Sequence, residues 1–229
     1  MLVPALLDWP YARLPADVRK TFEVALHAGA GVALLWLLRK DAVAAATDPV
    51  RTALLAAPAG LAGLALEGPI EQRASDPRVT AAAMIAGGIG LWATDSAAKP
   101  RGGVRPPSLY LIGLAQAVAL VPGISRNGAT LTAARALGVD REASARLSWR
   151  AGLPVIGGAT MLKLVRLSQD GLAPELRAPF AAGAAAALAS TLAAAPLLRV
   201  RSQRVSGAYR IVLGAVALCR LHRLEWPRG

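Results

Sequence analysis

Apolar residues along this chain gather in runs that are separated by short charged or glycine- and proline-containing connections. The runs cover Thr21–Leu38, Thr52–Leu66, Val79–Thr94, Ser108–Val121, Leu147–Leu167, Pro179–Leu198 and Gly207–Leu221, with a shorter helix-compatible stretch at Ala129–Leu137. A straight membrane-spanning helix needs roughly 20 residues, which several runs approach. The pattern therefore predicts an all-α integral membrane protein, a multi-span helical bundle with about six or seven spans.

Helix breakers set the expected ends of these runs. Glu67–Pro69 is expected to stop the second helix, and residues 95–107, with several prolines, are expected to form a loop. Gly138 can end a helix in a left-handed conformation, and Asp140 can cap the next one. Short, interrupted segments in a membrane protein are typical of re-entrant or discontinuous helices around a site. Residues 1–229 are interpreted as a single membrane domain.

Composition supports the membrane interpretation over a soluble, alanine-rich helical protein. Hydrophobic residues make up 55% of the chain and the mean hydropathy is +0.44, which leaves too little polar surface for a soluble fold. The net charge of +12 could indicate nucleic-acid binding. However, basic residues such as Arg199, Arg201, Arg204 and Arg210 lie mainly between apolar runs, without interleaved aromatics. Basic loops beside anionic lipid headgroups are the better interpretation, and no nucleic-acid partner is expected.

Few residues suit metal or redox chemistry. Cys219 is the single cysteine, so the chain forms no internal disulfide, and His27 and His222 fall short of a typical zinc ligand set. Glu23 and His27 lie four residues apart on one helical face and could form an acid–base pair. The favoured alternative places Glu23 near the membrane boundary and makes His27 an interhelical hydrogen-bond partner.

The segment Val121–Thr130 carries the chemistry. A Pro-Gly step ends an apolar helix there, and a new helix begins with amide N–H groups that favour an anion. Arg126 adds a charged fork of donors that matches phosphate oxygens, and Gly128 leaves room beside the backbone. The alternative is that Arg126 reaches the membrane interface while Ser125 or Asn127 caps the helix.

The stretch Pro122–Thr130 resembles the Pro-Gly-x-Ser-Arg-Ser-Gly-x-Thr signature of bacterial undecaprenyl-diphosphate phosphatases. It departs from that signature at Asn127, where the family usually has serine. Three flanking segments resemble the family as well: Ile112–Ala117 before the signature, Arg141–Ser148 after it, and Thr21–Gly29 near the start. The resemblance covers nearly all of the chain.

The resemblance implies a multi-pass enzyme of the bacterial plasma membrane. Such enzymes remove the terminal phosphate of undecaprenyl diphosphate and so release the carrier lipid for peptidoglycan precursor synthesis. The implied fold is a helical bundle with inverted repeats, each holding a re-entrant helix-loop-helix, here at residues 108–138 around the Pro-Gly-x-Ser-Arg signature. The site is expected to open toward the outer face of the membrane, and the implied partner is a polyprenyl diphosphate lipid.

The resemblance also assigns roles. Arg126 would clamp the diphosphate as a catalytic residue, with Ser125 beside it. The implied substrate-binding residues are Gly123, Asn127, Gly128 and Thr130. Ser125 and Thr130 would support Arg126 as hydrogen-bond donors. Gln116 and Ser148 could line the cavity. A divalent cation, Mg²⁺ or Ca²⁺, would neutralise the diphosphate, although the sequence does not identify its ligands.

A second family signature, acidic and serine-rich, is expected near the N-terminus and is not found. The opening Met1–Leu7 resembles the residues that follow that signature, so residues 1–20 are interpreted as a remnant of the N-terminal region. Two explanations stay open. The favoured one is a coding start assigned too late. The other is a homologue that binds or translocates polyprenyl phosphates with impaired catalysis.

Overall fold

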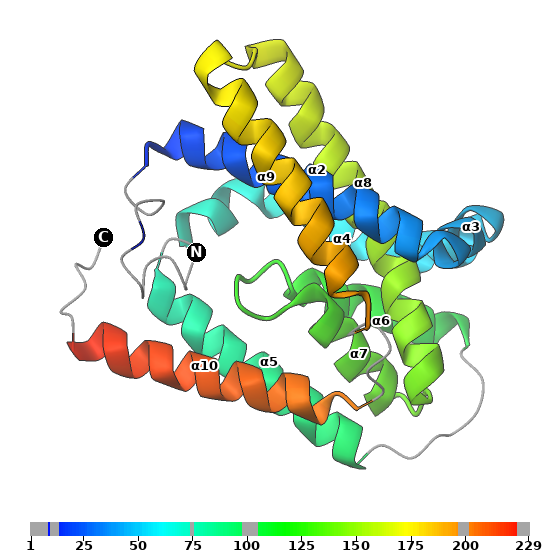
Figure 1. Cartoon of the computed structure of the whole chain (residues 1–229). Helices are drawn as coiled ribbons and strands as arrows, with labels where there is room; N and C mark the ends of the chain where they lie inside the picture. Colours follow the sequence, from blue (N-terminus) through cyan, green and yellow to red (C-terminus); the bar gives the residue numbers. More distant parts are fainter. Residues whose placement is uncertain (1–8, 10–13, 74–75, 98–104, 197–201, 224–229) are drawn as a thin grey trace.

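The computed structural model describes residues 9, 14–73, 76–97, 105–196 and 202–223 (Figure 1). Most of the expected N-terminal remnant, residues 1–20, lies outside the described residues, as do Arg199 and Arg201. The regular secondary structure in the described part of the chain is entirely helical. The α-helices are α2 (Ala16–Leu37), α3 (Arg39–Thr47), α4 (Pro49–Arg73), α5 (Pro77–Ala97), α6 (Pro106–Val118), α7 (Arg126–Ala136), α8 (Arg141–Asp170), α9 (Pro174–Ala193) and α10 (Arg204–Arg223).

Two of the described helices are long and apolar enough to cross a membrane, namely α4 over Pro49–Leu66 and α9 over Pro174–Ala193. Thr21–Leu37 of α2 and α3 together give a third candidate, bent by 81°. This count is lower than the six or seven spans expected from the apolar runs. One reason is that α6, which holds most of the run Ser108–Val121, has only 13 residues, too few for a straight span. The prediction of an all-helical protein with membrane-type helices is confirmed.

Two expected helix boundaries are confirmed in detail. Gly138 has a φ of +83° just after α7. The carboxylate of Asp140 accepts a hydrogen bond from the amide of Ala143 at 2.8 Å, and this satisfies one of the free N–H groups at the start of α8. The turn between α7 and α8 is therefore fixed by local sequence.

Three other expectations were wrong. Helix α4 continues through Glu67–Pro69 to Arg73 instead of ending there. Part of the expected loop at residues 95–107 is helical, because Asp95–Ala97 form the last turn of α5 and α6 begins at Pro106. Arg39, Lys40 and Asp41 follow the first apolar run, Thr21–Leu38, and were expected to end it, but a further helix, α3, begins at Arg39.

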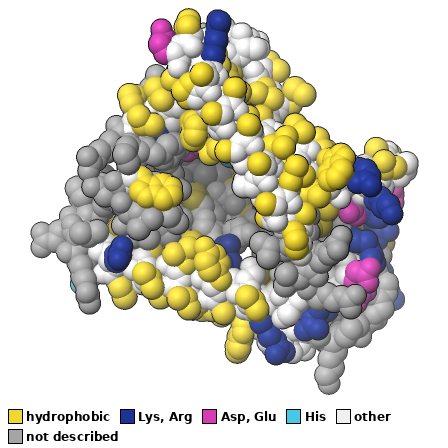
Figure 2. Space-filling view, in the orientation of Figure 1, with side chains coloured by type: hydrophobic (Ala, Val, Ile, Leu, Met, Phe, Trp, Pro, Cys, Tyr) yellow, Lys and Arg dark blue, Asp and Glu magenta, His cyan; other side chains and the backbone are white. Residues whose placement is uncertain are grey.

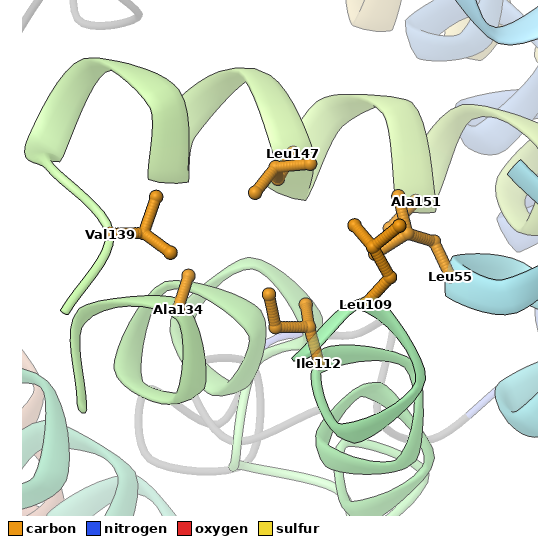
Figure 3. Close-up of a cluster of buried hydrophobic side chains, with 7 residues drawn as sticks. All are labelled: Leu55, Leu109, Ile112, Ala134, Val139, Leu147 and Ala151. Atoms are coloured by element: carbon orange, nitrogen blue, oxygen red, sulfur yellow. The ribbon is translucent and has the colours of Figure 1, made fainter. Parts of the chain in front are cut away.

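Helix α8 is the centre of the packing, where it contacts α2, α3, α4 and α7. Helix α7 packs against α5, α6 and α8, whereas α9 lies along α2 and α10 lies along α5 (Figure 1). Figure 3 shows the main buried cluster, where α8 packs on α6 and α7 and α4 adds Leu55. Its members are Leu55, Leu109, Ile112, Ala134, Val139, Leu147 and Ala151. This apolar contact holds the signature helix α7 against α8.

The outer faces of the helices are apolar. Hydrophobic side chains run along α9 and α10 in the space-filling view, whereas Lys and Arg side chains lie mainly near helix ends (Figure 2). The exposed large side chains include Trp36 of α2, Leu61 and Leu64 of α4, and Tyr209 and Val212 of α10. Apolar patches of this extent on a protein surface indicate a membrane or another apolar partner.

Candidate anion-binding site

The signature forms the turn between α6 and α7. Gly123 has a φ of +102°, and a Cβ at this position would overlap the main-chain oxygen of Thr80 in α5, so only glycine fits. Ser125 has a φ of +67° and is the N-cap of α7, where its hydroxyl oxygen accepts from the amide of Gly128 at 3.3 Å. Such a conformation is strained for a side-chain-bearing residue and is found most often at functional sites.

A second helix also holds this turn. Nη2 of Arg210 in α10 donates to the main-chain carbonyl of Gly123. Arg210 was expected in a connection between apolar runs, but it lies inside α10 and is partly buried. The signature turn is therefore fixed from both sides, by Thr80 of α5 and Arg210 of α10.

Arg126 is the first residue of α7, and its guanidinium reaches α8. Nη1 donates to the main-chain carbonyl of Ser148 at 2.8 Å and lies 3.5 Å from Oε1 of Gln116. The ring of Trp149 lies 5.7 Å from the guanidinium carbon, within the range of a cation–π contact. Gly152 provides the space, because a Cβ there would overlap the guanidinium.

The charge of Arg126 is not neutralised by a carboxylate in the described part of the chain. Its hydrogen bonds to protein groups there use Nη1, so Nη2 and Nε keep donor capacity. A partly buried guanidinium without a counter-ion is costly unless an anion or water meets it. Arg126 and the N-terminal amides of α7 together therefore suit a phosphate group.

A polar network lies beside Arg126. The hydroxyls of Thr130 and Ser148 are fully buried and 2.6 Å apart, and the hydroxyl of Ser148 donates to Oδ1 of Asn127. Nε2 of Gln116 lies 3.4 Å from the main-chain oxygens of Leu55 and Ala151, which leaves Oε1 facing Arg126. The structure thus brings together five residues selected from the sequence, which we call the Arg126 cluster: Gln116, Arg126, Asn127, Thr130 and Ser148.

Glu23 and His27 are the acid–base candidates from the sequence. Both are in α2, which packs mainly on α9, α8 and α3. Nδ1 of exposed His27 donates to the main-chain carbonyl of Glu23 at 2.7 Å, a contact within one helix rather than between helices. Among the contacts of the described residues, none joins His27 to the Arg126 cluster. Their role as an acid–base pair stays a prediction.

Sequence reasoning missed several residues that shape the site. Trp149, Gly152 and Arg210 were not selected, because each lies outside the signature. A signal for one of them was present, since Ser144, Ser148 and Gly152 are small residues spaced four apart on a helix. Such spacing marks a face where another group approaches the helix closely.

Helices with apolar outer faces and a partly buried arginine at a helix N-terminus are the features of a membrane-type helical protein with a candidate anion site. The family model described as bacitracin resistance protein BacA matches residues 1–216, so this chain belongs to that family. A protein of Trichlorobacter lovleyi, named undecaprenyl-diphosphatase, is 37% identical over 81% of this chain and 73% of its own length. Two similar proteins have the same name. The one from Geobacter sulfurreducens is 36% identical over 96% of this chain and 89% of its own length. The one from Thermomicrobium roseum is 36% identical over 95% of this chain and 88% of its own length.

Proposed function

We propose that this protein is an undecaprenyl-diphosphatase, a phosphoric anhydride hydrolase that releases phosphate from undecaprenyl diphosphate and leaves undecaprenyl phosphate. Membership of the BacA family and several relatives with this name, which together cover most of the chain, support the activity. The product lipid is the carrier that peptidoglycan synthesis reuses, and continued recycling of this lipid underlies bacitracin resistance.

The observation that carries the proposal is the guanidinium of Arg126 at the N-terminus of α7 without a carboxylate partner among the described residues. Phosphoryl transfer depends mainly on positioning and on neutralising charge on the phosphate oxygens. Arg126 and the first amides of α7 meet both needs in a partly buried place, where electrostatic stabilisation is strong. The hydroxyl hydrogen of Ser125 and the backbone at Gly123 complete the proposed phosphate contact, and Gly128 leaves room for the phosphate beside the backbone.

Hydrolysis requires a water molecule as the second reactant. Its oxygen bonds to the terminal phosphorus while the bridging P–O bond breaks, and the lipid monophosphate leaves. A group that takes the proton of this water must lie within hydrogen-bond distance of it. Glu23 and His27 stay the candidates from the sequence for this role, and no contact among the described residues brings His27 to the Arg126 cluster.

The finer arrangement in the membrane is also a proposal. The break between α6 and α7, both too short to span alone, supports a re-entrant helix-loop-helix at residues 108–138 in a multi-pass protein of the bacterial plasma membrane. A divalent cation would help to neutralise the diphosphate. However, the described residues hold no group of three or more His, Cys, Asp or Glu side chains that could bind one. We therefore derive no step through a metal.

The test replaces Arg126 by alanine in the detergent-solubilised protein. Phosphate release from undecaprenyl diphosphate should fall by at least about 100-fold, because a charged donor to the phosphate is lost. Arg146→Ala is the matched control, since Arg146 is exposed on α8 and pairs with Glu142 in the neighbouring turn. The control should keep full activity.

The same experiment separates the activity from its alternative. Full activity in Arg126→Ala would contradict the site assignment. A wild-type protein that binds or translocates the labelled lipid without releasing phosphate would instead indicate a binding or translocating homologue. Lipid binding is therefore measured beside phosphate release in each variant.

A further inference from the structure

Ser148 lies on α8 and contacts the two residues that open α7. Its main-chain carbonyl accepts from Nη1 of Arg126 at 2.8 Å, and its hydroxyl donates to Oδ1 of Asn127. The hydroxyl is fully buried, so water does not compete for these contacts. A single residue of α8 therefore holds two consecutive polar side chains of the signature.

The hydrogens in this network can be arranged in two ways. Oγ of Ser148 lies 2.6 Å from Oγ1 of Thr130, and a hydroxyl has a single hydrogen to donate. Because Ser148 donates its hydrogen to Asn127, Thr130 must donate to Ser148. In the opposite arrangement, Ser148 donates its hydrogen to Thr130, and Thr130 donates to the carbonyl of Arg126, 3.0 Å away. Asn127 must then turn its amide nitrogen toward Ser148. The orientation of the Asn127 carboxamide thus depends on both hydroxyls.

With its oxygen on Ser148, the carboxamide of Asn127 directs its nitrogen elsewhere. Among the hydrogen bonds of the described residues, none uses that nitrogen. Asn127 also follows Arg126 directly in the first turn of α7, where N–H donors and the helix dipole favour an anion. The free amide N–H groups are therefore placed at the end of α7 that suits a phosphate.

We propose that Ser148 is a positioning residue of the anion site: together with Thr130 it holds the Asn127 carboxamide so that its N–H groups donate to the phosphate bound by Arg126. This inference rests on the proposed phosphatase function. It extends that function by making Asn127 a direct phosphate donor and Ser148 the residue that orients it.

A double-mutant cycle tests the coupling. Ser148→Ala and Asn127→Ala should each lower kcat/KM for undecaprenyl diphosphate by about 10-fold or more, the effect of losing a hydrogen bond to a charged group. The double variant should be no slower than Asn127→Ala, because the Ser148 hydroxyl acts through Asn127. Independent losses that multiply in the double variant would overturn the proposal.

Asn127→Asp tests the orientation. Aspartate keeps an oxygen for Ser148 but replaces the N–H donor by a negative oxygen, so we expect a loss of about 100-fold in kcat/KM with an unchanged unfolding temperature. Activity near that of the wild type would overturn the proposal.

Ser144→Ala is the control, because Ser144 is equally buried one turn earlier on α8 and lies 3.4 Å from the carbonyl of Val139. It should keep wild-type kcat/KM.

Failure of the inference and failure of the proposed function are distinguishable. If the wild-type protein releases no phosphate, the proposed function is wrong, and the same cycle is measured on the Kd for the lipid diphosphate. Coupled changes in Kd would still support the positioning role of Ser148, and additive changes would reject it. If the wild type is active, the kcat/KM values of the single and double variants decide whether Ser148 positions Asn127.

Discussion

At the scale of single residues, Gly152 determines where the charge of Arg126 lies. A Cβ at Gly152 would overlap the guanidinium, which is held between the carbonyl of Ser148 and the ring of Trp149. Gly152→Ala should therefore displace Arg126 and lower phosphate release by about 100-fold, as expected when a catalytic group moves by about 1 Å. Measurement of kcat/KM on the purified variant checks this prediction.

The control for this change is Gly157→Ala on the same helix. A Cβ at Gly157 meets open space, so alanine should leave activity unchanged and favour the helix by up to about 1 kcal/mol. Equal activity of the two variants would show that Gly152 does not determine the position of Arg126.

Much of the candidate site could be predicted from sequence because its polar residues stand in or near one short signature. Arg126, Asn127 and Thr130 lie in consecutive turns of the chain, and the helix start between them follows from local chemistry. Trp149 and Gly152 could not be assigned in this way. Their role depends on how α8 crosses α7, which is a tertiary contact that local sequence does not encode.

At the scale of helices, glycine allows α5 and α10 to lie close together. A Cβ at Gly88 would lie 2.8 Å from the main-chain oxygen of Gly207, and one at Gly207 would lie 2.8 Å from that of Gly88. Gly88→Ala should force the helices apart and lower the free energy of unfolding by about 1–3 kcal/mol. Thermal unfolding in detergent measures the change.

Gly60→Ala in α4 is the control for helix packing, because a Cβ at Gly60 meets no other atom within 4 Å. Its unfolding temperature should be equal to or above that of the wild type. A Gly88→Ala protein that is as stable as this control would contradict close packing of α5 on α10.

Most helices could be predicted because apolar runs and helices coincide, as Val79–Thr94 does with α5. The helix boundaries were less predictable. Pro69 was expected to stop α4, yet the helix continues to Arg73, and α8 continues through Pro154. A proline weakens a helix locally, but neighbouring helices and a long apolar run can hold it together.

At the scale of the whole molecule, Asp95 joins α5 by polar contacts to α7 and to the starts of α8 and α10. It lies buried in the last turn of α5 and accepts from Nε of Arg141 at the start of α8 at 2.6 Å. Its other oxygen accepts from the hydroxyl of Ser202 at 3.3 Å and the amide of Gln203 at 3.1 Å, just before α10. Arg135 of α7 lies 3.8 Å away. The signature helix and α10 are thus linked through one carboxylate.

Asp95→Ala should lower the free energy of unfolding by about 3–5 kcal/mol, because it removes a buried carboxylate that pairs with Arg141 and lies 3.8 Å from the buried guanidinium of Arg135. Glu142→Ala removes a carboxylate from an exposed pair with Arg146 and should cost about 0–1 kcal/mol. Thermal unfolding of both variants gives the comparison, and amide exchange shows where the protein opens. We expect α10 to exchange first in Asp95→Ala, since its main packing partner is α5. Equal stability of the two variants, or uniform exchange across all helices, would mean that apolar packing alone holds α10 in place.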